Sequence, residues 1–225
     1  MEKRKTVFFY GLPGAGKGTQ ANLLVNTMGF WHFDSGKFIE HFVHDPARQN
    51  DAIVQRERAL FDGGSLNTPE WILEIVREKA EKMLVSADIV FSGSARTLFE
   101  AFGDERNKGL IESLSLISDV YIFWLDVEDA AAIQRNCARV ICSTCSTPFI
   151  NFEGLKYPAC PLCGSLLKKR ILDNPETMKK RLQEYRLRTA PVIEKIGLSD
   201  LAVHKIDANL SPQEVHFQVL EILKA

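Results

Sequence analysis

The segment 11–20, Gly-Leu-Pro-Gly-Ala-Gly-Lys-Gly-Thr-Gln, constrains the fold of this chain more than any other. It follows the apolar run 6–10, which predicts a short strand, and it precedes apolar residues spaced three to four apart, which predict a helix. In such a setting a glycine-rich loop turns its backbone amides inward, and the helix start adds partial positive charge. We therefore predict a phosphate-binding loop in which Lys17 reaches the terminal phosphates. Its candidate residues are Gly14, Ala15, Gly16, Lys17, Gly18 and Thr19.

Short apolar runs alternate with helical patterns along the chain. Runs that favour strands occur at 6–10, 30–33, 89–91, 120–125 and 201–206, and helical periodicity is clear in 71–84 and 215–223. This alternation predicts an α/β fold with a parallel five-stranded sheet covered by helices on both faces, as in P-loop NTPases. Ligands of such sheets bind at the carboxyl ends of the strands.

Length and charge exclude several classes of protein. The 225 residues suit one large domain with an insert, and 28 basic against 29 acidic residues give a net charge of −1. This balance disfavours a polybasic nucleic-acid-binding protein, and a hydrophobic content of 45% disfavours disorder. The chain contains no apolar run near the roughly 20 residues of a membrane span and no secretory signal, so we expect a soluble, cytoplasmic protein.

Four of the five cysteines form two Cys-x-x-Cys pairs, Cys142 with Cys145 and Cys160 with Cys163, separated by 14 residues. This pattern predicts a tetrahedral, structural Zn²⁺ site with no open position for chemistry. A redox dithiol is the alternative. Cys137 lies outside the pairs, and we expect it to be a small buried hydrophobic residue.

The loop sequence, with a helical region carrying arginines around the cysteine insert, resembles the adenylate kinase family of nucleoside monophosphate kinases. It is similar to the long bacterial form, whose lid carries a zinc knuckle, over essentially the whole chain. The resemblance implies transfer of the γ-phosphoryl of ATP-Mg to a nucleoside monophosphate, AMP by default. It also implies a core of residues 1–139 and 171–225 with an acceptor-binding segment at about 34–68, and a lid at 140–170.

The cofactors implied by the resemblance are Mg²⁺ with ATP and a structural Zn²⁺. The implied partners are nucleotides alone, without nucleic acid or membrane, and the default state is a monomer. The catalytic cations implied are Lys17, Arg96, Arg135, Arg139, Arg170 and Arg181. The ATP-binding residues implied are those of the phosphate-binding loop with Arg135, Arg139 and Leu210. These cations would stabilise charge on the transferred phosphoryl group, and no side chain would act as a nucleophile.

Three segments resemble the acceptor site of the family: Ser35-Gly36, the stretch 64–68 and the stretch 92–97. The stretch 64–68 would line the acceptor base through its backbone, whereas Thr68 equally suits a helix cap. The acceptor-binding residues implied are Ser35, Gly36, Lys37, Glu40, Ser65, Leu66, Asn67, Gly93, Arg96, Glu100, Arg170 and Arg181.

The chain departs from the family pattern on the acceptor and magnesium side. Ser92 and Lys37 stand where the family has aspartates, and Glu40 stands where it has the arginine that clamps the acceptor phosphate. Lys37 could reach that phosphate or pair with Glu40 on the helix surface. Asp34 could replace a lost carboxylate or cap the helix that starts beside it.

Glu100 replaces the glutamine that reads adenine in the family, so we expect altered acceptor specificity. The departures also support an alternative function, a nucleotide-binding protein of this fold with weakened catalysis that acts through lid closure or a partner. A third interpretation, in which the cysteine insert binds nucleic acid, has little aromatic or basic content to support it.

Overall fold

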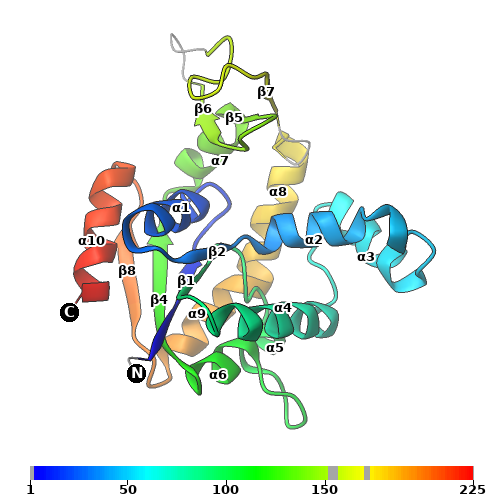
Figure 1. Cartoon of the computed structure of the whole chain (residues 1–225), viewed down its shortest axis with the longest axis vertical. Coiled ribbons are helices and arrows are strands. Elements are labelled where there is room, and N and C mark those ends of the chain that lie inside the picture. The colour runs from blue at the N-terminus through cyan, green and yellow to red at the C-terminus, as the bar shows by residue number, and fades with distance from the viewer. Residues whose placement is uncertain (1–2, 152–156, 170–172, 225) are drawn as a thin grey trace.

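The computed structural model describes residues 3–151, 157–169 and 173–224, and it contains the predicted parallel sheet. The strand order is β2-β3-β1-β4-β8 (Figure 1). The strands are β1 Arg4–Tyr10, β2 Trp31–Phe33, β3 Ile89–Phe91, β4 Ser118–Asp126 and β8 Val203–Asp207. Each of the five predicted runs forms one of them, which confirms the predicted fold class.

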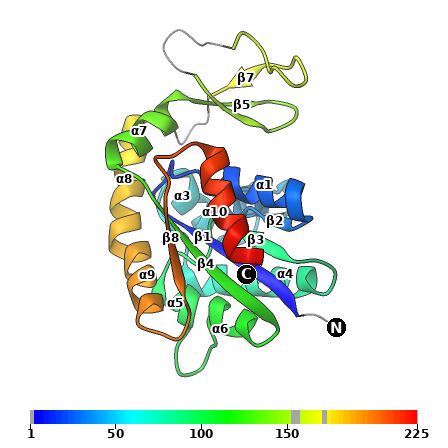
Figure 2. The ribbon, with the colours of Figure 1, turned by 90° about the vertical axis from the view of Figure 1, so that its left-hand side faces the viewer.

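Helices cover both faces of the sheet because successive residues of a strand point to opposite sides. Val7 and Phe9 of β1 pack with α1 (Lys17–Met28) and α10 (Pro212–Lys224), whereas Phe8 and Tyr10 pack in a second core. Figure 2 shows α1 and α10 on the first face. The second core contains residues of α4 (Pro69–Leu84), α5 (Leu98–Phe102), α6 (Leu110–Ser115) and α9 (Ala190–Gly197).

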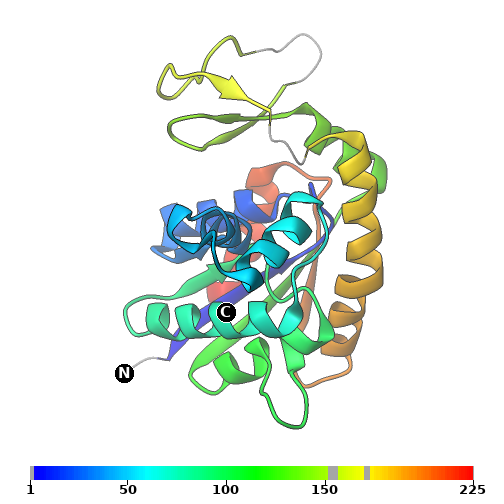
Figure 3. The same cartoon turned by 90° about the vertical axis from the view of Figure 1, so that its right-hand side faces the viewer.

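The remaining helices lie around the carboxyl ends of the strands. Helices α2 (Ser35–Val43) and α3 (Ala52–Asp62), joined through the 3₁₀ turn η1 (Pro46–Arg48), project to one side in Figure 1. Helix α7 (Asp129–Ala138) leads into the cysteine-containing insert. Helix α8 (Pro175–Glu184) leads back, and the π-helical turn η2 (Tyr185–Thr189) continues it into α9, as Figure 3 shows.

The insert forms a separate small antiparallel sheet at one end of the molecule (Figure 1). Its order is β6-β5-β7, with β5 Arg139–Cys142, β6 Pro148–Ile150 and β7 Leu167–Lys168. Within the described ranges, none of the helices combines the length and the apolar composition that a bilayer-spanning helix needs.

Two local expectations need correction. Thr68 occupies the N-cap position of α4, but its hydroxyl donates to Glu57 at 2.5 Å instead of capping the helix. Cys137 is half-buried instead of buried, because it lies on the partly exposed helix α7. In contrast, Asn174 caps α8, accepting a hydrogen bond from the backbone N–H of Thr177 at 2.9 Å.

Candidate active site

A cleft of about 1400 Å³ lies where the strand ends, the helix α2 and the insert meet. It forms at the carboxyl ends of the strands, as expected for a parallel sheet. The predicted residues that line it are Gly14, Ala15, Gly16, Lys17, Gly18, Thr19, Gly36, Lys37, Glu40, Ser65, Leu66, Asn67, Gly93, Arg96, Arg135, Arg139, Arg181 and Leu210. Arg170 lies outside the described residues.

The loop after β1 is folded around Lys17. The ammonium group of Lys17 donates to the carbonyl oxygens of Gly11 and Leu12, both at 2.8 Å. Gly14 has a φ of +97°, and a Cβ on it would lie 2.4 Å from the carbonyl oxygen of Ala132. A side chain there would be strained and would collide with α7, so this turn requires glycine.

The positive charge in the cleft is concentrated near Lys17. Burial, followed by the nearby charges of Arg96, Arg181 and Arg139, lowers the pKa of Lys17 to about 7. Several cations close together in a partly desolvated site disfavour the protonated form of Lys17 and attract anions. A bound polyphosphate would raise the pKa of Lys17 again and keep it protonated.

Two of these arginines are held by one buried acid. The guanidinium of Arg139 donates to both carboxylate oxygens of Asp173, at 2.8 and 2.7 Å, and Arg181 lies 3.6 Å from the same carboxylate. The Asp173 side chain is 1% exposed. A two-point ion pair of this kind fixes the direction of the guanidinium, so Asp173 connects β5 of the insert with α8.

Arg135 and Arg96 are held by backbone carbonyl groups. Arg135 donates to the carbonyl oxygen of Ala208 at 2.8 Å, beside the loop after β8 that contains Leu210. Arg96 donates through Nε to the carbonyl oxygen of Gly93 at 2.6 Å, just beyond β3. Both side chains line the cleft, so the structure brings them to the same site as Lys17.

Glu100 is buried, and it stabilises the turn that carries Arg96. Its carboxylate accepts from the backbone N–H of Arg96 at 2.7 Å and from the hydroxyl of Thr97 at 3.1 Å. Burial raises the pKa of Glu100 in spite of these bonds. Glu100 does not line the large cleft but a small cavity of about 20 Å³ beside it, together with Leu66 and Arg96.

Other residues that the sequence predicts for the acceptor site make internal contacts. The hydroxyls of Ser35 and Ser94 are 2.7 Å apart and buried, and the Asn67 amide donates to Glu57. Asp34 caps α2 by accepting from the backbone N–H of Lys37 at 3.2 Å. Asp34 and Lys37 nevertheless line the cleft.

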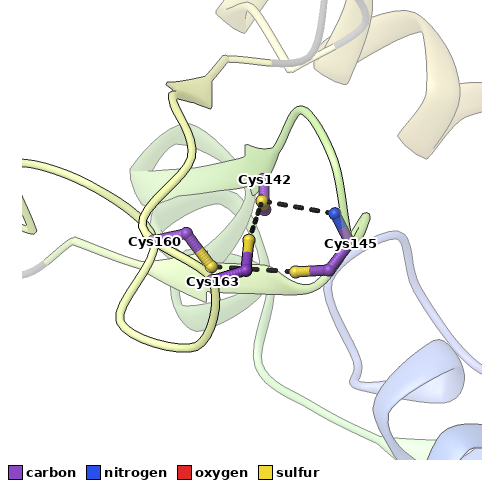
Figure 4. A group of neighbouring side chains, drawn as sticks. All are labelled: Cys142, Cys145, Cys160 and Cys163. Carbon is purple, nitrogen blue, oxygen red and sulfur yellow. Dashed lines mark hydrogen bonds between the residues drawn. The ribbon is translucent and has the colours of Figure 1, made fainter.

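The four paired cysteines converge at the base of the insert (Figure 4). Their sulfur atoms all lie within 4.8 Å of one another, with Cys142 and Cys163 at 3.4 Å and Cys145 and Cys160 at 3.7 Å. Four thiolates at about 2.3 Å from one Zn²⁺ lie roughly 3.8 Å apart, so the group fits a tetrahedral zinc site. Hydrogen bonds from Ser165 lower the pKa of Cys163 to about 6, which favours the thiolate that a metal binds.

Comparison with known proteins agrees with this geometry. Residues 9–198 match the family model described as Adenylate kinase. The chain belongs to the adenylate kinase family. A protein named Adenylate kinase from Chlamydia pneumoniae is 30% identical over 195 residues, which cover 86% of this chain and 85% of the relative. Another of that name, from Rhizorhabdus wittichii, is 28% identical over 96% of this chain and 98% of its own length. The family resemblance of the sequence is thereby confirmed.

Two cleft-related residues of this adenylate kinase family member were missed by the sequence reasoning. Asp173 precedes the helix cap at Asn174 and resembles an ordinary turn residue, with no pattern in the sequence that marks it as the partner of two arginines. His32 lies in the short strand β2, between aromatic residues, and no sequence pattern separates it from them. Lys168 and Lys169 also line the cleft.

Proposed function

We propose that this protein is a phosphotransferase that moves the γ-phosphoryl group of ATP to a nucleoside monophosphate, with AMP as the default acceptor and ADP as the product. The observation that carries the proposal is the position of Lys17 in one cleft with Arg96, Arg139 and Arg181. Burial, followed by the charges of these arginines, lowers the pKa of the lysine. Membership of the adenylate kinase family supports the reaction class.

The cations divide between two nucleotides in this proposal. The loop 14–19, Arg135, Arg139 and Leu210 bind ATP, while Arg96 and Arg181 bind the acceptor on the opposite side of the cleft. Phosphoryl transfer requires stabilisation of charge on the phosphate oxygens and the exclusion of water, which converging arginines provide. Asp173 holds Arg139 and Arg181 in place between them.

The insert acts as a lid in this proposal, with residues 140–170 closing over the core of residues 1–139 and 171–225. The four thiolates would hold a Zn²⁺ that stabilises the fold of the insert, since a segment of this size has too small a core to fold alone. The metal therefore has no part in the chemical step.

Mg²⁺ would enter the site with ATP. It neutralises charge on the phosphates when bound, and it accepts mainly phosphate and water oxygens with one or two protein ligands. Thr19 and Ser92 offer hydroxyl oxygens to this part of the cleft. Asp34, the carboxylate considered as a replacement, caps α2.

A panel of acceptors tests the proposal. ATP-Mg-dependent transfer to AMP, GMP, CMP, UMP and their deoxy forms is measured side by side, with Lys17→Ala as the blank. Transfer to AMP above the blank is the expected result. Binding of ATP without transfer to any acceptor would contradict it and favour the alternative of a nucleotide-binding protein with weakened catalysis, which Ser92 and Glu40 support.

A further inference from the structure

A chain of three polar side chains crosses from α1 to the end of β3. His32 of β2 is its centre: Nδ1 lies 2.8 Å from Oδ1 of Asn22, and Nε2 lies 2.7 Å from the hydroxyl oxygen of Ser92. All three residues line the cleft. An imidazole that is bonded on both ring nitrogens has a fixed orientation, so this chain is an ordered unit.

The sheet places this unit beside the phosphate-binding loop. Strand β3 lies between β2 and β1, and Phe91 pairs with Phe33 on one side and with Phe8 on the other. Ser92 is the next residue, so its hydroxyl lies at the strand end adjacent to the loop after β1. In P-loop enzymes an oxygen ligand from such a strand end helps to hold the magnesium of the nucleotide.

The hydrogen bonds of His32 determine whether the Ser92 hydroxyl donates to the imidazole or accepts from it. The Asn22 amide oxygen is an acceptor, so the proton of a neutral His32 is on Nδ1 and Nε2 accepts. The Ser92 hydroxyl must then donate its hydrogen to Nε2, which leaves the lone pairs of its oxygen for other partners. A cation or a metal-bound water can use those lone pairs.

We propose that Asn22 and His32 are positioning residues for Ser92, and that the oriented Ser92 oxygen receives the magnesium of the bound nucleotide or a water of its shell. The inference rests on the proposed function for its choice of ligand. A neutral hydroxyl supported by a histidine thereby takes the place of a carboxylate at this strand end. Its effect is on the metal-dependent part of nucleotide binding.

The surroundings of His32 favour its neutral form. Burial lowers the pKa of His32, Asp34 opposes this shift and Lys37 adds to it. The side chains that hydrogen-bond His32 come from α1 and from the end of β3, and both, Asn22 and Ser92, are uncharged. A protonated His32 would donate from Nε2 and turn the Ser92 hydrogen toward the cleft, so acidification should weaken metal-dependent binding.

The first test compares the affinity for a non-hydrolysable ATP analogue with Mg²⁺ and with EDTA. In Ser92→Ala, the gain in affinity that Mg²⁺ provides should fall about fivefold, as expected for one hydrogen bond, while metal-free affinity stays the same. His32→Leu should give the same loss. His32→Gln keeps an oxygen that can accept from Ser92 and should retain most of the gain. His41→Leu, at an exposed histidine of the same cleft, is the matched control and should change neither affinity.

The second test reads the His32 proton directly by ¹⁵N NMR of the imidazole at neutral pH. We expect the form protonated on Nδ1, with a signal that shifts when Mg²⁺ is added to the analogue-bound protein. A proton on Nε2, or equal losses of metal-free and metal-dependent affinity in Ser92→Ala, would overturn the proposal. Neither readout requires turnover, so a protein that binds the metal–nucleotide in this way but transfers nothing would refute the proposed function alone.

Discussion

The loop around Lys17 and the part of the cleft that contains Ser92, Lys37 and Glu40 are built in different ways. The loop around Lys17 is shaped by backbone conformation, with glycines at positive φ and carbonyl groups bonded to the lysine. The part of the cleft that contains Ser92, Lys37 and Glu40 depends on side chains, and there the chain departs from the family pattern. A backbone-shaped site constrains its sequence strongly, because few residues can adopt the required conformation. A side-chain site tolerates replacement when a neighbour such as His32 supplies the missing contact.

Of the changes that test this comparison, Lys17→Ala should have the largest effect. The backbone forms the loop and Lys17 supplies charge, so we expect transfer to fall by about 10³-fold while the chain stays folded. Initial rates and circular dichroism spectra of the variant and the wild type measure the two effects. A variant with wild-type turnover would show that the arginines alone provide the charge.

Gly14→Ala and Gly18→Ala separate backbone strain from loss of a contact. Gly14 has a positive φ, and a Cβ on it would lie 2.4 Å from a backbone carbonyl oxygen. A Cβ on Gly18 would have no atom of the described residues within 4 Å. We expect Gly14→Ala to lower the free energy of unfolding by about 1–3 kcal/mol and Gly18→Ala to leave it unchanged or raise it slightly. Urea titrations of both variants would measure this. Equal destabilisation would mean that the loop is less constrained than its geometry indicates.

Removal of zinc tests whether the insert is a unit separate from the sheet that carries the loop around Lys17. Chelation should loosen β5, β6 and β7 and lower the melting temperature by a few degrees, because the metal stabilises a part of the chain with little core. Hydrogen exchange should rise in the insert while β1 and β4 stay protected. If chelation unfolds the whole chain in one step, the insert is no separate unit.

Glu100→Gln should have the smallest effect, and it tests the side-chain-built half. Because burial raises the pKa of Glu100 in the folded state, ionisation costs stability as the pH rises above the unfolded pKa of about 4.3. The free energy of unfolding of the wild type should therefore fall relative to that of the variant as the pH rises above about 4.3.

The acceptor panel on the same pair of proteins tests specificity. We expect the preference between AMP and the other acceptors to differ between wild type and Glu100→Gln, since a carboxylate and an amide offer different hydrogen-bond groups. An unchanged preference, with the stability difference intact, would leave Glu100 only its role in the turn that carries Arg96.

The fold was predictable because its signals are local and repeated. Five short strands, the loop before α1 and two cysteine pairs each carry a pattern within a few residues. The pairings that complete the cleft were not predictable. Asp173 binds Arg139 from 34 residues away, and His32 meets Ser92 from 60 residues away. An isolated acid or histidine has no pattern that distinguishes such a role from a turn or a core position.

The sequence by itself determined the parallel sheet, the glycine-requiring loop and the metal-binding cysteines, because backbone conformation and ligand spacing are written in neighbouring residues. Only the tertiary structure decided what the departures from the family pattern mean. It directs Glu100 to the backbone of Arg96, Asp34 to the start of α2 and Ser92 to His32. The physical reason is that a polar side chain takes its partner from whatever the fold brings within hydrogen-bond distance, and that choice is made between strands and helices far apart in the chain.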